Sequence, residues 1–149
     1  MKFGKLYDTV VARGIEFDPR GNAEMKRILA DQKKAHEKLE GVDKEIFDEA
    51  SLKNPFSDTR ILFGDRDAQI RGIIVGIDME APELLLADRL RERGKKIDLV
   101  LTHHPEGRAL VGLPEVMAVQ ADTMAAAGVP INVGEAIMAG RMEEVSRGV

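Results

Sequence analysis

Residues 97–106 read IDLVLTHHPE, and this stretch decides how the second half of the chain is interpreted. The apolar run predicts a buried strand, and Pro105 indicates where that strand ends because proline has no amide hydrogen for a sheet. His103 and His104 stand together at this end. Imidazole is the commonest metal ligand and the main acid–base group near neutral pH, so these two side chains are the first candidates for a functional site.

Strands and helices are expected to alternate on both sides of this segment. We expect, in chain order, helices over 5–13, 22–39 and 43–50, a short strand over 60–64, a strand over 70–78, a helix over 82–94, the strand over 97–102, a helix over 114–127, a strand over 129–133 and a final helix from about residue 136. The β-α-β-α-β-α order predicts an α/β fold with a mainly parallel sheet. Residues 1–149 would form one domain, with a helical N-terminal segment over 1–58 and the α/β core over 59–149.

Composition excludes several classes of protein. The net charge is −4 and only 4% of the residues are aromatic, which disfavours a nucleic-acid partner. The chain has no apolar run long enough for a membrane span and no apolar signal core after its N-terminus, so a cytoplasmic protein is expected. The absence of cysteine means that any metal must be held by imidazole, carboxylate and water.

The ends of the predicted strands define the candidate site. Asp78 ends one strand, His103 and His104 end the next, and Glu135 follows the third. In open α/β sheets, ligands bind outside the carboxyl ends of the strands, so this edge is expected to hold one divalent ion or a dinuclear pair. Nitrogen and oxygen ligands suit zinc, manganese, iron or nickel equally. Asp78 could instead cap a turn, and Glu135 could be an ordinary acid in the first turn of a helix.

Two further features have a structural and a functional interpretation. His36 and Glu40 are four residues apart on a predicted helix, which would suit either a surface pair or a metal-binding pair. Glu106 follows the histidines and could be either a solvated turn residue or part of the same site. No histidine is placed in the sequence to activate Ser146, so a catalytic triad is not expected.

Residues 73–106, with VGID at 75–78 and DLVLTHHP at 98–105, resemble the NGG-interacting-factor-like family, whose members are also described as type-two GTP cyclohydrolase I homologues. The resemblance implies a dinuclear metal site with His103 and His104 as ligands, and ring-shaped homo-oligomers. It also implies further ligands, an Asp after a later strand and a His-x-x-x-Glu pair near the C-terminus, that have no counterpart here. We therefore expect either a fragment of a longer protein or a divergent short member.

Together these observations favour a metal-binding protein that is, in its complete form, a metal-dependent hydrolase acting on a small nucleotide-like substrate. Asp78 would orient a ligand or a water molecule, and no other catalytic residue is identified. The alternative is a non-enzymatic interaction or regulatory scaffold, in which the helical first half provides the surface for a protein partner.

Overall fold

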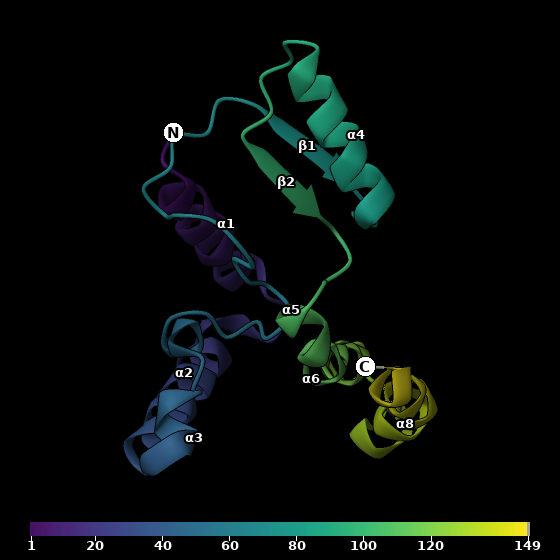
Figure 1. Cartoon of the computed structure of the whole chain (residues 1–149). Helices are drawn as coiled ribbons and strands as arrows, with labels where there is room; N and C mark the ends of the chain where they lie inside the picture. Colours follow the sequence, from purple (N-terminus) through teal and green to yellow (C-terminus); the bar gives the residue numbers. More distant parts are fainter. Residues whose placement is uncertain (149) are drawn as a thin grey trace.

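The computed structural model describes residues 1–148, and these residues are mostly helical. Helices hold 59% of the chain and strands 7%. Two short strands form the only sheet within the described residues (Figure 1). The prediction of a mainly parallel α/β sheet over residues 59–149 was therefore wrong, and a single β-α-β unit lies among helices instead.

The N-terminal half consists of helices α1 (Phe3–Phe17), α2 (Gly21–Glu37) and α3 (Gly41–Glu45) and a 3-10 helix, η1 (Glu49–Leu52). Gly14 does not end α1 as predicted. It lies inside the helix against the ring of Phe56, where an added Cβ would come within 2.8 Å of a ring carbon. The predicted helix over 43–50 is divided, because the Asp48 side chain accepts a hydrogen bond from the amide of Ala50 and starts η1.

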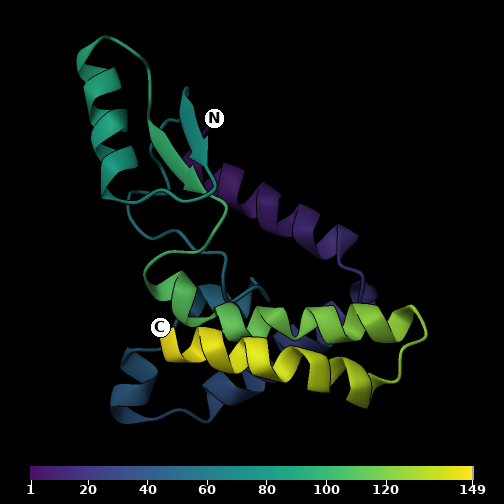
Figure 2. The same cartoon turned by 90° about the vertical axis from the view of Figure 1, so that its right-hand side faces the viewer.

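The β-α-β unit comprises β1 (Ile73–Gly76), α4 (Ala81–Glu92) and β2 (Leu99–Thr102). The strands are parallel, with Ile73 opposite Leu99 and Gly76 opposite Thr102. Strand β1 is shorter than expected because the chain just before it pairs elsewhere: the amide of Ile70 donates to the carbonyl of Met1 at 2.8 Å. Helix α4 runs along one side of the sheet (Figures 1 and 2).

The starts of the two strands are held together closely. A Cβ on Gly72 would lie 1.6 Å from the carbonyl oxygen of Lys96, so only glycine fits at this approach. The Asp98 carboxylate accepts hydrogen bonds from the amides of Arg71, at 2.8 Å, and Gly72, at 3.2 Å. These amide donors hold the pKa of Asp98 below its usual value.

The C-terminal part is helical: α5 (Arg108–Val111), α6 (Leu113–Met117), α7 (Val119–Ala126) and α8 (Ile131–Gly148). The predicted strands over 60–64 and 129–133 do not form. Pro130 has a backbone angle suited to a first helical turn, and its carbonyl accepts from the amide of Val133 at 2.9 Å. Helix α8 then turns back along α7, with Gly134 against Ala121 (Figure 2).

Few side chains are fully buried. The buried apolar residues are Val11, Met25, Ile70, Met79, Ala87, Ala109, Ala121 and Met138. Asn54 is the one buried polar residue among those described. Many large apolar side chains remain exposed instead, on the sheet and on the helices. No helix within residues 1–148 has the length and apolar character needed to cross a bilayer.

Candidate metal centre

The parallel pairing of β1 and β2 continues beyond the strands and brings the predicted site residues together. The amide of His103 donates to the carbonyl of Gly76 at 2.9 Å, and the amide of His104 donates to the carbonyl of Ile77 at 2.8 Å. The Thr102 hydroxyl is within hydrogen-bond distance of the carbonyl oxygens of Ile77, at 2.9 Å, and His104, at 2.8 Å. The backbone around the histidines is thus fixed against the end of β1.

Asp78 contacts one of the two histidines directly. Its Oδ1 lies 2.6 Å from Nδ1 of His104, and the two side chains are 60% and 57% exposed. When His104 is neutral and Nδ1 carries its proton, Nδ1–H donates to the carboxylate and Nε2 keeps a free lone pair. Metal-binding histidines commonly have this arrangement, in which a carboxylate fixes the tautomer and the ring orientation.

The second imidazole lies beside the first. The ring centroids of His103 and His104 are 5.2 Å apart, and the ring planes are inclined by 32°. Adjacent residues in a regular strand point to opposite sides, so this proximity depends on the chain leaving the strand before Pro105. The arrangement gives two imidazoles and one carboxylate at the carboxyl end of a parallel strand pair.

The remaining candidates do not join this cluster. Glu135 lies within α8, because the third strand that would have carried it to the sheet is absent. Glu40 lies beyond the end of α2, so it does not share a helix with His36. The ring of His36 instead packs against Phe47, with centroids 4.5 Å apart. Glu106 is half-buried in the turn that follows the histidines.

The donor set suits a loosely held divalent ion. Within residues 1–148, no three His, Asp or Glu side chains are arranged to hold one ion. His103 and His104 could provide two nitrogen ligands, while the contact with His104 already occupies Asp78. Water would have to complete the coordination, because transition-metal sites normally use three or four protein ligands.

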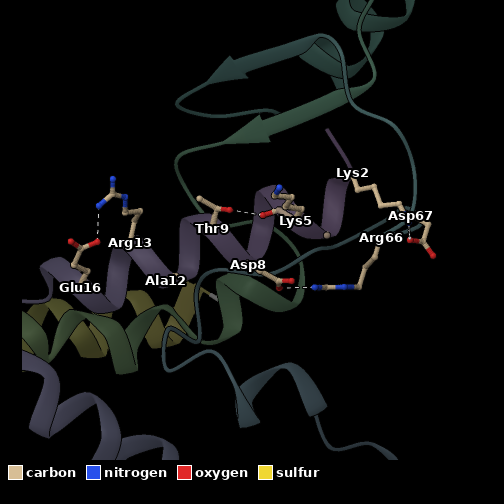
Figure 3. Close-up of a pocket in the computed structure, with 10 residues that line it drawn as sticks. Lys2, Lys5, Asp8, Thr9, Ala12, Arg13, Glu16, Arg66 and Asp67 are labelled. Atoms are coloured by element: carbon tan, nitrogen blue, oxygen red, sulfur yellow. Dashed lines mark hydrogen bonds and ion pairs between the residues drawn. The ribbon is translucent and has the colours of Figure 1, made fainter.

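A cavity of about 660 Å³ lies on α1 and away from the histidines. Figure 3 shows that most of its charged side chains pair with one another: Lys2 with Asp67 at 2.8 Å, Arg66 with Asp8 at 2.6 Å, and Arg13 with Glu16 at 2.7 Å. The hydrogen bond between Lys2 and Asp67 raises the pKa of the lysine and lowers that of the carboxyl. These pairs neutralise most of the charge in the cavity. The sequence did not indicate it, because its residues come from two distant segments.

Comparisons with models of protein families, with curated proteins and with solved structures found no match to this chain. The resemblance of residues 73–106 to the NGG-interacting-factor-like family therefore stays a prediction.

Proposed function

We propose that this protein binds a divalent transition metal through His103 and His104 and serves as a metal-dependent hydrolase for a small nucleotide-like substrate. The observation that supports metal binding is the 2.6 Å contact between Asp78 Oδ1 and His104 Nδ1. In the tautomer with the proton on Nδ1, this contact leaves Nε2 available for a metal. The substrate class rests on the family resemblance alone, as does a dinuclear site in a ring-shaped homo-oligomer.

The residues of the chain have separate tasks in this proposal. His103 and His104 hold the ion, and Asp78 fixes the orientation of the His104 ring. A bound divalent ion supplies Lewis acidity and lowers the pKa of a coordinated water molecule. The exposure of the site leaves room for water and substrate beside the imidazoles.

The proposed metal site is tested by titrating the purified chain with zinc in an isothermal titration calorimeter. We expect one weakly bound zinc equivalent per chain, or two if the site is dinuclear, and loss of this binding in the His103→Ala/His104→Ala variant. Asp78→Asn should weaken zinc binding by about tenfold. Loss of a carboxylate that orients a metal-binding histidine typically costs about 10–100-fold, and the lower value is expected here because Asp78 and His104 are both exposed. His36→Ala is the matched control, since its ring packs against Phe47 away from the site.

Equal zinc binding by the wild type and the double variant would contradict the proposed site. The hydrolase part is tested separately by product release from a panel of nucleoside triphosphates with added zinc, manganese, iron or nickel. Activity that requires the metal and is lost in the double variant supports it. If the chain binds zinc but hydrolyses none of the nucleoside triphosphates, the proposed substrate class is wrong and the proposed metal site still stands.

A second function is favoured by the surface of the helical half. Large apolar side chains there are exposed, including Phe17 and Ile46, and Phe63 in the following loop is 94% exposed. Ile46 and Phe63 line the same cavity, and exposed apolar residues that lie together are typical of surfaces that contact another protein. The scaffold function predicts that the double histidine variant still binds its partner, whereas Phe63→Ala weakens that binding.

A further inference from the structure

The sheet has one covered face and one open face. Residues that alternate along β1 point to opposite sides, so Ile73 and Val75 share one side with Leu101 of β2. Ile77 is the first residue after the end of β1. All four are exposed, Val75 at 63% and Ile77 at 62%. The alternate residues Ile74 and Val100, which point to the other side, are half-buried. We call the four exposed residues the open face.

An open face of this kind is unusual for parallel strands. Parallel sheets are normally covered on both faces, and a pair of strands alone buries little apolar surface. Val75 and Leu101 are opposite each other in the register, so they mark the centre of the open face. Ile73 lies two residues before Val75 at the start of β1, and Ile77 lies two residues after Val75, just beyond the end of β1.

Charge is divided between the two ends of this unit. The exposed side chains where the strands start and α4 ends are mainly basic: Arg71, Arg91, Arg93, Lys95 and Lys96. The end where the strands finish and α4 begins is acidic: Asp78, Glu80, Glu83 and Glu106. The open face therefore lies between a positive and a negative end.

We propose that a second copy of this chain covers the open face, with its strands running in the opposite direction. A two-fold axis across the strands at Val75 would place β1 on β1 and the basic end of each copy beside the acidic end of the other. If the strands of the two copies ran in the same direction, β1 of one copy would lie on β2 of the other. The two basic ends would then lie together, as would the two acidic ends, and this repulsion opposes association. The charge pattern thus selects the antiparallel dimer.

The exposed area suggests a modest affinity. The open face provides a few hundred Å² of apolar surface per copy, less than the roughly 800 Å² per partner of a typical stable complex. The charged ends must contribute, so dimerisation should be in the micromolar range and weaken as salt screens them. The proposed dimer does not depend on metal binding. Its tests are made in EDTA, so that the dimer proposal and the metal-site proposal can fail independently of each other.

The first test measures the dissociation constant of the dimer by sedimentation equilibrium. Val75→Glu should weaken it at least tenfold, because each copy would then bury a carboxylate next to its symmetry mate. Leu85→Glu is the matched control, because Leu85 is exposed to a similar extent as Val75. Leu85 lies two positions before the buried Ala87 and therefore points to the opposite, solvent-exposed side of α4. A wild-type chain that stays monomeric at several hundred micromolar would overturn the proposal, and so would a Val75→Glu variant that dimerises like the wild type.

The second test uses the absence of cysteine to determine the orientation. Single variants Ile73→Cys and Ile77→Cys are treated with a short bismaleimide, separately and mixed, after circular dichroism has confirmed that each is folded. The antiparallel dimer predicts that the mixture gives cross-linked heterodimers and that each variant alone gives few. Val75→Cys alone should cross-link efficiently. Efficient cross-linking of Ile73→Cys to itself would overturn the antiparallel arrangement.

Discussion

The replacement of Asn54 by alanine should destabilise the fold strongly, because this side chain joins α1 to the loop after η1 and is only 1% exposed. Its Nδ2 donates to the Tyr7 hydroxyl of α1 at 2.8 Å and to the carbonyl of Thr59 at 2.6 Å. Its Oδ1 accepts from the amide of Phe56 at 2.9 Å. The asparagine thereby fixes the loop after η1 against the first helix.

The magnitude follows from what each partner would lose. The Thr59 carbonyl would still accept from the side chains of Arg60 and Tyr7, so it would not be left without a donor. The Phe56 amide would lose the Asn54 oxygen, and an unsatisfied buried amide costs about 1–3 kcal/mol. Two further hydrogen bonds, at about 0.5–1.5 kcal/mol each, bring the expected loss to about 2–6 kcal/mol.

Urea denaturation followed by circular dichroism at 222 nm measures this loss as a lower midpoint at an unchanged slope. Asn22→Ala is the matched control, since Asn22 is exposed on α2, and it should change stability by no more than about 0.5 kcal/mol. A loss below about 1 kcal/mol for Asn54→Ala at the same slope would refute the reasoning, because water or a rearranged loop would then be satisfying the amide of Phe56.

Two further results are expected. The hydrogen bond from Arg20 holds the pKa of Asp18 below its usual value, so the stabilisation by Asp18 should be present above about pH 4 and lost as the pH falls through its folded value. Asp18→Asn should therefore show a weaker decline of the urea midpoint between pH 5 and pH 2, and a parallel decline would count against this ion pair. Gly72→Ala should lower the urea midpoint, because the added Cβ would meet the carbonyl oxygen of Lys96. In Gly140→Ala, on α8, the added Cβ meets nothing, so this variant should be more stable by about 0.5–1 kcal/mol. Equal effects of the two substitutions would contradict the close approach at Gly72.

The sequence predicted the local helices better than the sheet. Helix α2 begins and ends within two residues of its expected bounds, because the periodicity that predicts a helix acts over short distances in the chain. The strand over 129–133 was predicted from its apolar residues, yet the chain at Pro130 turns into α8, which packs on α7 through Gly134. A short segment whose apolar residues are separated by Pro130 and Asn132 can form either element, and here tertiary packing favoured the helix.

The site was predictable to the extent that it depends on one β-α-β unit. Parallel strands that are consecutive in the chain place their carboxyl ends side by side, and this brings Asp78 close to the pair of histidines. Glu135 was expected at the same edge only because a third strand was expected. The pairing of Asp78 with His104 rather than with His103 could not be predicted, because it depends on how the chain turns after Thr102.

The proposed metal site and the proposed dimer interface act on the same weak element, and this has a consequence for stability. A two-stranded parallel sheet has little burial of its own, so any ligand that binds only when β1 and β2 are paired shifts the equilibrium toward the paired state. A metal ion would do so at the ends of the strands, through His103 and His104, and a second copy would do so over Val75 and Leu101. Both events would favour the same paired state, so each should strengthen the other. The hydrogen bond from the His104 amide to the carbonyl of Ile77 joins the histidines to the open face directly.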